Sequence, residues 1–173
     1  VFDAVCDLAV ERGLRVTGSE LVGLIPKSAL IDAGKYYLKK QGRSLGVSEN
    51  DILECAVQSL GLNDVSKFSS KEKIIEFAIE DKKDSLLHLS TDDLIHSVSQ
   101  NSPSPGGGSV SALAGALGAA LLSMVSLLTY DKKEYLSKRT KMSNLGEMAH
   151  KYQKRLKELI DEDTRAFDSV INA

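Results

Sequence analysis

The sequence predicts a mainly α-helical chain in which an α+β unit is followed by an all-α helical bundle. Apolar residues recur at helical spacing along most of the 173 residues. One stretch, residues 14–26, has apolar residues on both faces of an extended chain, which predicts a buried strand. The composition changes abruptly at residues 81–91, so we expect a linker there, between a first domain over residues 1–80 and a second over residues 92–173.

The first domain is expected to begin with a helix, the strand and a second helix. Residues 2–12 carry apolar side chains at helical spacing and stop at Gly13. The strand follows, interrupted at residues 18–20. The second helix lies between Pro26, a residue favoured in the first turn, and Gly42, a residue favoured beyond the last turn.

Two more helices are expected to complete the first domain. Ser48 and Asp51 form a capping-box pattern, which opens a helix that stops before Gly61. Isoleucines at helical spacing predict a further helix over residues 71–80. The first domain is thus expected to combine one strand with four helices.

The second domain is expected to contain a short helix, a glycine loop and two long helices. Thr91 is expected to cap a helix over residues 92–99, and a Pro/Gly/Ser-rich loop follows. The next helix, residues 110–130, has large apolar residues on one face and small residues on the other. The last helix begins near Leu145 and runs to the end of the sequence.

Two environments are open for the apolar helix. Residues 110–129 are long and apolar enough to span a membrane. Serines and glycines dilute this segment, however, the chain has no Trp, and polar helices flank it on both sides. We therefore prefer the central helix of a soluble bundle to a membrane span. In a bundle, the small residues would let a neighbouring helix or subunit come close.

Charge and cysteine content exclude several classes of protein. Lys and Arg number 22 against 24 Asp and Glu, so no general positive field attracts nucleic acid. The two cysteines form no CxxC pair, which favours a reducing, cytoplasmic location. The first residues resemble neither a signal peptide nor a natural start, so we expect Val1 to lie inside a longer protein.

A candidate ligand site lies at the glycine loop. Gly106, Gly107, Gly108 and Ser109 precede the apolar helix, and the first N–H groups of a helix have no partner within it. Such an end can bind an anion or a polar ligand edge. The pattern is not a Walker loop, because no Lys follows the glycines. A flexible connector without a ligand is the alternative.

Asp163 is the sharpest candidate for catalysis. At about 100° per residue it projects into the middle of the apolar stripe of the last helix. A carboxylate that faces a core must be paired, hydrogen-bonded or protonated, and burial favours the protonated form, which suits proton transfer. An equally weighted alternative is a structural Asp that bonds a nearby helix end.

Other chemistry is poorly supported by the sequence. His88, His96 and His150 are scattered and no second ligand stands at a metal-binding spacing, so no metal site is predicted. Lys132 and Lys133 belong to a basic turn, which is either a solvated surface or an attraction for a polyanionic ligand tail.

Two motif sets together resemble one family. PSPGGGSVSALAGALGAALLSMVSLLTY (103–130) and LIDEDTRAFDSV (159–170) resemble the cyclodeaminase domain of formiminotransferase-cyclodeaminases and of small bacterial cyclodeaminase or cyclohydrolase relatives. Upstream, VTGSELVGLIPKSALIDAGKYYL (16–38) and LGLNDVSKFSSKEKIIEFAI (60–79) resemble the C-terminal subdomain of the formiminotransferase part. The resemblance implies a partial α+β subdomain joined to the first part of an all-α bundle.

The resemblance also implies a folate enzyme of histidine degradation. One activity transfers a formimino group from formiminoglutamate to tetrahydrofolate, and the other cyclises 5-formiminotetrahydrofolate to 5,10-methenyltetrahydrofolate with release of ammonia. The family's cyclodeaminase acid matches Asp163, which would act as general acid and base. The residues Gly106 to Ser109 would line the folate pocket, and Lys132 and Lys133 would meet a polyglutamate tail.

The resemblance further implies that this chain is only part of such an enzyme. The transferase histidine and the main folate-binding stretch would lie upstream of Val1, and the bundle would continue past Ala173, so these residues alone are expected to be inactive. Full-length relatives form ring-shaped homo-oligomers. The competing hypothesis is a helical interaction or oligomerisation module that has lost the chemistry.

Overall fold

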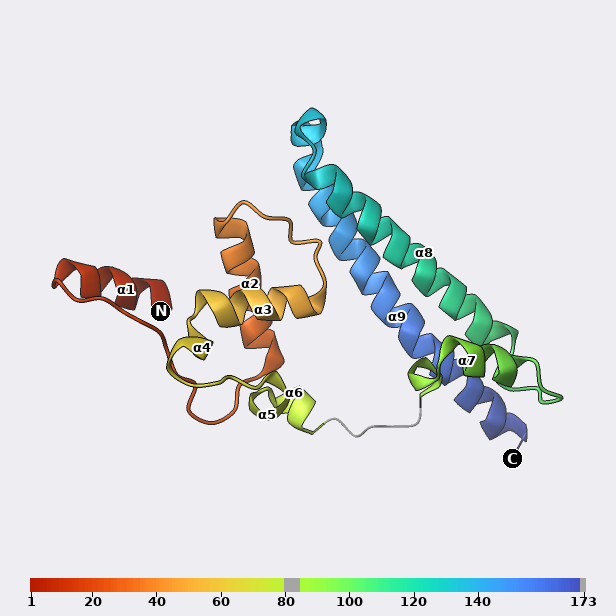
Figure 1. The fold of residues 1–173 in the computed structure, drawn as a ribbon. Helices are drawn as coiled ribbons and strands as arrows, with labels where there is room; N and C mark the ends of the chain where they lie inside the picture. Colours follow the sequence, from red (N-terminus) through yellow and green to blue (C-terminus); the bar gives the residue numbers. More distant parts are fainter. Residues whose placement is uncertain (80–84, 172–173) are drawn as a thin grey trace. The chain divides into compact units, whose positions relative to one another are not determined.

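The computed structural model describes residues 1–79 and 85–171. It divides into two compact units, Val1–Asp81 and Lys82–Ala173, which are described one at a time. Helices account for nearly all regular structure in both units (Figure 1). The predicted mainly α-helical class is therefore confirmed.

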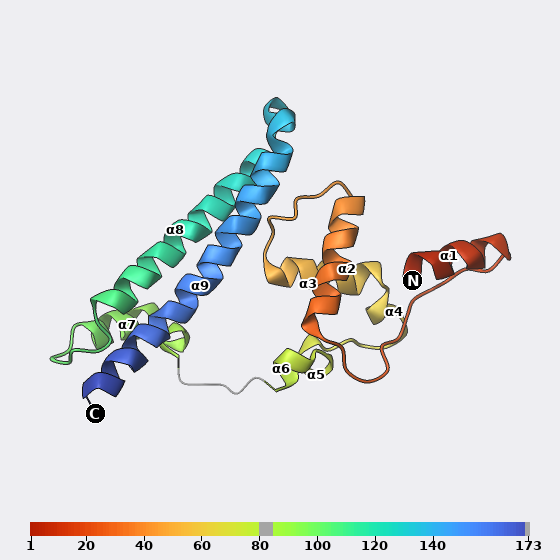
Figure 2. The same cartoon turned by 180° about the vertical axis from the view of Figure 1, so that it is seen from behind.

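The first unit is built around two crossing helices. These are α2 (Lys27–Lys40) and α3 (Glu49–Ser59), which cross in both ribbon views (Figures 1 and 2). The predicted capping box opens α3. Ser48 Oγ accepts the backbone N–H of Asp51 at 3.2 Å, and Asp51 Oδ2 accepts that of Ser48 at 3.2 Å. The other helices of the unit are α1 (Phe2–Glu11) and the one-turn helices α4 (Leu62–Val65), α5 (Ser70–Lys73) and α6 (Ile75–Ala78).

A glycine lets α2 and α3 approach each other closely. A Cβ at Gly34 would meet the carbonyl oxygen of Ile52 and lie 2.6 Å from its Cγ2. Buried apolar residues from both helices form the core on either side of this crossing. These buried core residues are Leu30, Tyr37, Leu38, Ile52, Leu53, Cys55, Ala56, Val57, Leu62 and Ile74.

The strand predicted over residues 14–26 is wrong for the described residues, which contain no sheet. Ile25 alone pairs, in an isolated parallel bridge with Ile74. A single bridge cannot sustain a strand, which needs neighbours along its length. Without a sheet to cover it, half of the segment's apolar face stays open to solvent, and Val22 is 89% exposed, whereas Leu21 and Ile25 pack against the helical core. The α+β character expected of this domain is therefore absent here.

The single helix predicted over residues 71–80 is also wrong. Ile74 is extended, with φ −89° and ψ 121°, and it separates α5 from α6. The residues on either side of Ile74 make the bonds of the bridge: the N–H of Ile75 donates to the carbonyl of Ile25 at 3.0 Å, and the N–H of Ile25 donates to the carbonyl of Lys73 at 2.9 Å. The Ile74 side chain is fully buried, so tertiary packing overrides the helical spacing. Glu80 lies outside the described residues.

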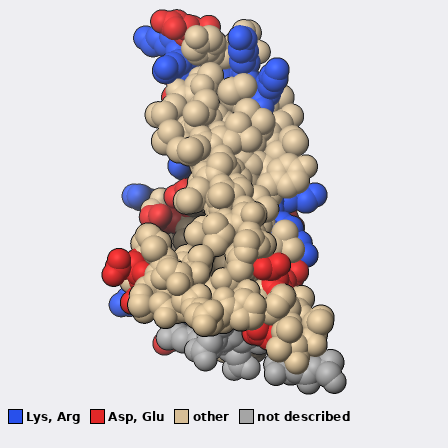
Figure 3. Space-filling view, turned by 90° about the vertical axis from the view of Figure 1, so that its right-hand side faces the viewer, with Lys and Arg blue, Asp and Glu red and all other residues tan. Residues whose placement is uncertain are grey.

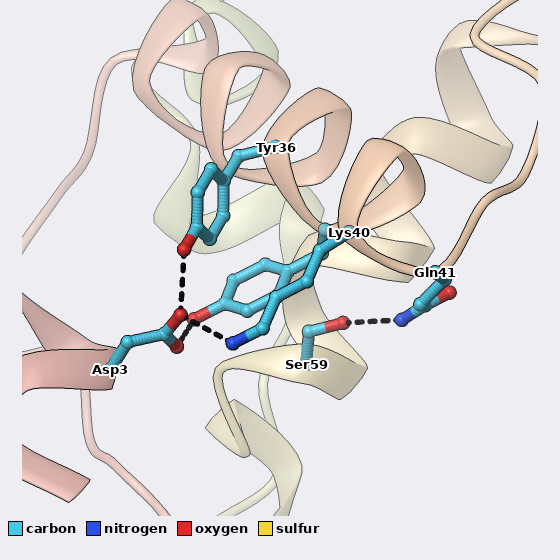
Figure 4. A network of polar contacts seen from close by, with 6 residues as sticks. Asp3, Tyr36, Lys40, Gln41 and Ser59 are labelled. Atoms are coloured by element: carbon cyan, nitrogen blue, oxygen red, sulfur yellow. Dashed lines mark hydrogen bonds and ion pairs between the residues drawn. The ribbon is translucent and has the colours of Figure 1, made fainter. Parts of the chain in front are cut away.

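One carboxylate anchors α1 to α2. Asp3 accepts hydrogen bonds from the hydroxyls of Tyr36 and Tyr37, both at 2.8 Å, and from Lys40 Nζ at 2.7 Å (Figure 4). The Lys40 ammonium and then the two hydroxyls lower the pKa of Asp3 to about 2. The rest of α1 buries no residue. The attachment of α1 therefore depends mainly on its first turn.

We expect acid to release α1. An ordinary Asp has a pKa of about 3.9, so the Asp3 anchor is complete above about pH 4 and is lost as the pH falls through about 2. Asp3→Asn should remove this pH dependence, as followed by NMR shifts of the Tyr36 and Tyr37 rings. Asp7→Asn, on the same helix and exposed, should leave it in place. Identical titrations of both variants and the parent would refute the anchor.

The second unit is dominated by a long antiparallel helix pair, α8 (Gly107–Tyr130) and α9 (Arg139–Ile171) (Figures 1 and 2). The turn between them contains the 3₁₀ helix η2 (Lys133–Lys138). A second 3₁₀ helix, η1 (Leu86–His88), and α7 (Thr91–Val98) precede α8. Of the expected linker 81–91, residues 81–84 lie outside the described residues, and the remainder contains η1.

The starts of the helices in this unit differ slightly from the sequence prediction. The cap of α7 is Ser90 rather than Thr91, since Ser90 Oγ accepts the N–H of Asp93 at 3.1 Å. α8 begins at Gly107 rather than at Val110, so Gly107, Gly108 and Ser109 form its first turn. The last helix begins at Arg139 rather than near Leu145. Periodicity locates the middle of a helix better than its ends, because helix ends fray and often pass into a 3₁₀ turn.

α8 packs through its small residues. Its buried positions are Ser109, Ala112, Ala116, Ser123 and Ser126. The predicted close approach is confirmed, because a Cβ at Gly115 would lie 3.3 Å from the Leu156 side chain on α9. The large apolar residues point outward instead, and Figure 3 shows an almost uncharged surface on this side. Those exposed residues are Val110, Leu117, Leu121, Leu122, Met124, Val125 and Leu128.

Among the described residues, α8 is the one helix long and apolar enough to cross a membrane. Length and composition do not separate such a span from the core helix of a soluble bundle. Within this unit α8 lies along α9, whose other side carries many charged residues.

Candidate functional site

The glycine loop and Asp163 meet at the N-terminus of α8. Asp163, on α9, accepts the backbone N–H of Ser109 through Oδ2 at 2.9 Å, across 54 positions of sequence. The carboxylate thereby satisfies one of the first N–H groups of α8, which have no partner within the helix. Its negative charge also lies at the positive end of the helix. Two candidates that the sequence singled out separately are thus in direct contact.

Ser109 is the centre of this contact. Its side chain is buried, and Oγ lies 2.7 Å from the Ile160 carbonyl, 3.0 Å from Thr164 Oγ1 and 3.2 Å from Asp163 Oδ2. A hydroxyl carries one proton and can accept two further hydrogen bonds. Ser109 can therefore change which oxygen it donates to without moving any heavy atom.

The three glycines predicted as a loop have different surroundings, and Gly107 and Gly108 belong to the first turn of α8. A Cβ at Gly108 would overlap the Asp163 carboxylate. A Cβ at Gly106 would lie 2.9 Å from the Pro103 carbonyl oxygen, and one at Gly107 would meet nothing within 4 Å. Of the three, Gly108 is thus the one whose lack of a side chain leaves room for the Asp163 carboxylate.

Asp163 is exposed rather than directed into a core, contrary to the expectation from periodicity. The side of α9 that faces α8 carries Gly146, Ala149 and Ile160, which are buried. This side is centred about 60° from Asp163 around the helix. Much of the apolar stripe is therefore open as well, and Tyr152, for example, is 57% exposed.

Two neighbouring acids, which sequence reasoning missed, tie further segments to the same part of α9. Asp161 accepts Ser85 Oγ at 2.6 Å and the N–H of Leu86 at 2.9 Å, which holds η1. Asp168 accepts Ser104 Oγ at 2.7 Å, which holds the loop before the glycines. Ser85 and Ser104 were the available signal in the sequence. Their pairing with acids more than 60 positions away cannot be derived from the sequence, because it depends on how the chain folds.

The basic turn is far from the glycine loop. Lys132 and Lys133 follow the C-terminal end of α8, whereas Gly106 and Ser109 lie at its other end. A helix of 24 residues is about 36 Å long. The structure therefore does not bring these lysines to the other candidate residues within one chain.

One histidine has a role that the sequence did not indicate. His150 Nε2 lies 2.8 Å from the buried Ser123 Oγ and joins α9 to α8.

A second histidine, His88, lines a pocket of about 370 Å³. The other lining residues are Ser85, Leu86, Leu89, Asp161, Thr164 and Arg165. Over residues 1–79 and 85–171, no group of three side chains is arranged to hold a metal ion.

Comparison with protein families accounts for both units. Residues 1–80 match the model of the formiminotransferase domain, and residues 90–173 match the model of formiminotransferase-cyclodeaminase. The two matches leave only residues 81–89 uncovered. The chain belongs to the formiminotransferase-cyclodeaminase family. The second match includes all of α8, which favours the bundle helix over the membrane span.

Several curated members of the formiminotransferase-cyclodeaminase family are similar along the whole chain. The formimidoyltransferase-cyclodeaminase of Sus scrofa is 38% identical over 175 aligned residues, and that of Gallus gallus is 37% identical over 177. Both alignments include 100% of this chain and 32% of the relative. The chain thus spans about a third of the length of these relatives.

A shorter similarity links the chain to a bacterial folate enzyme. The methenyltetrahydrofolate cyclohydrolase of Methylorubrum extorquens is 38% identical over 76 residues, which are 44% of this chain and 36% of the relative. The resemblance seen in the sequence motifs is therefore confirmed as membership of the formiminotransferase-cyclodeaminase family.

Proposed function

We propose that the chain is part of a bifunctional folate enzyme of histidine degradation. One activity would transfer the formimino group of formiminoglutamate to tetrahydrofolate. The other would cyclise 5-formiminotetrahydrofolate to 5,10-methenyltetrahydrofolate and release ammonia. The observation that supports the second activity is the contact between Asp163 and the glycine loop at the start of α8.

Cyclodeamination needs two proton transfers, and one carboxyl group can perform both. N10 of the folate attacks the formimino carbon and loses a proton to a base, and the amine then leaves as ammonia after it gains a proton from an acid. Oδ2 of Asp163 is held by Ser109. Oδ1 has no hydrogen-bond partner among residues 1–79 and 85–171, so we propose it as the atom that moves the proton.

The segment Gly106 to Ser109, at the start of α8, would line the folate pocket beside Asp163. Within one chain, Lys132 and Lys133 lie about 36 Å from the start of α8, so only a long polyglutamate tail could reach them from the folate pocket. We therefore propose that a long tail follows the helix pair or that another subunit supplies these lysines. No metal is needed for either proton transfer.

The protein is proposed to be a cytoplasmic homo-oligomer. The two cysteines are unpaired thiols, which suits a reducing compartment. The apolar face of α8 is exposed, and we propose that either the remainder of the bundle or a second subunit packs against it. Residues 1–173 alone are then expected to be inactive. The same exposed face also supports the second candidate function, a helical interaction module without catalysis.

An assay of the full-length protein tests the proposal. Purified without detergent and given 5-formiminotetrahydrofolate, it should form methenyltetrahydrofolate and ammonia in equal amounts. Heat-denatured protein provides the control for the uncatalysed reaction. A folded, soluble protein with no rate above this control would favour the interaction module, and a requirement for detergent would favour the membrane span.

A further inference from the structure

Gly108 lies where the Asp163 carboxylate reaches the first turn of α8. A Cβ built at this position would be 2.6 Å from Oδ2 and closer still to Oδ1 and Cγ. Real Cβ atoms do not come this close to other heavy atoms. Any side chain at position 108 would therefore push the carboxylate out of its present place.

Backbone geometry does not explain the glycine. Gly108 lies inside α8, and it is not among the glycines with positive φ, which are Gly13, Gly23, Gly42 and Gly61. An alanine would fit the helical backbone there and would favour the helix. The space taken by Asp163 is what requires a glycine.

We infer that Gly108 and Ser109 are positioning residues for Asp163. Gly108 leaves room for the carboxylate, and the N–H and hydroxyl of Ser109 fix Oδ2, so that Oδ1 is presented for proton transfer. This inference rests on the proposed function of Asp163. It gives Gly108 a role different from lining the folate pocket.

Ser109 can serve both protonation states of the acid. When Asp163 is ionised, the Ser109 hydroxyl can donate to Oδ2 across 3.2 Å. When Oδ1 carries a proton, Oδ2 still accepts the N–H of Ser109 at 2.9 Å, and the Ser109 hydroxyl can donate to the Ile160 carbonyl at 2.7 Å instead. A group that alternates between base and acid thus keeps a hydrogen-bond partner in each state.

The test compares three variants of the full-length protein in the cyclodeaminase assay: Gly108→Ala, Asp163→Ala and the double variant. Displacing a catalytic group by about 1 Å costs about 100-fold in rate, so Gly108→Ala should lower kcat to that extent and leave KM nearly unchanged. The double variant should be no slower than Asp163→Ala, because no carboxylate is left to displace. Gly118→Ala, at an open position of the same helix, is the matched control.

Each outcome separates the inference from the proposed function. If Asp163→Ala is inactive but Gly108→Ala keeps its kcat, or raises KM alone, the positioning role is wrong and the function stands. If Asp163→Ala keeps its kcat, the proposed function itself fails. Should Gly108→Ala fold poorly, its melting temperature must recover in the double variant, and a double variant as unstable as Gly108→Ala would overturn the steric argument.

Discussion

Replacing Asp163 with Asn in the full-length protein is expected to lower the rate of methenyltetrahydrofolate formation by about 10²–10⁴-fold. The amide has nearly the shape of the carboxylate, and its oxygen can still accept the N–H of Ser109. It can neither take up the N10 proton nor protonate the departing amine. The loss should therefore fall on kcat, with folate binding retained.

Asp161 provides the control for this substitution. It lies two positions earlier on α9 and binds η1 rather than the glycine loop. Asp161→Asn removes the same charge and is expected to retain most of the rate, as measured by methenyltetrahydrofolate absorbance and ammonia release. Full turnover by Asp163→Asn would refute the catalytic role and leave Asp163 as a structural cap of α8.

Replacing Gly34 with Ala is expected to lower the free energy of unfolding of the first unit by about 3 kcal/mol. The new methyl group would meet the backbone oxygen of Ile52, which cannot rotate away as the end of a side chain can. α2 and α3 would have to separate, and the apolar contacts beside the crossing would loosen.

Urea unfolding followed by circular dichroism measures this effect. Lys39→Ala, an exposed substitution on the same helix, should change the midpoint little. Equal midpoints for Gly34→Ala and Lys39→Ala would show that the helices do not cross at Gly34.

The helices of this chain were predictable because their signals are local. The capping box at Ser48 and the apolar spacing of α2, α3, α8 and α9 depend on residues within a few turns of each other. Ile74 was not predictable in this way, because its extended backbone and burial depend on Ile25, far away in the sequence. The strand prediction failed for the same reason, since strands are stabilised by partners outside their own segment.

The candidate site was predictable in its members but not in its geometry. Periodicity singled out Asp163, and the loop chemistry singled out Gly108 and Ser109. Their contact, and the overlap that explains Gly108, arise only when α9 folds back along α8. The separation of Lys132 from the loop follows equally from the length of α8, which a motif does not convey.

The polar contacts between α8 and α9 have a consequence for the sliding of one helix along the other. Alanine and serine faces are nearly uniform, so packing alone distinguishes poorly between neighbouring axial offsets. Ser109 and Ser123 are 14 positions apart on α8, and their partners Asp163 and His150 are 13 apart on α9, both about 20 Å. Because both contacts are satisfied at one axial offset only, together they fix the position of α8 along α9. A shift by a single residue would break both contacts at once, and an insertion between positions 109 and 123 would break at least one.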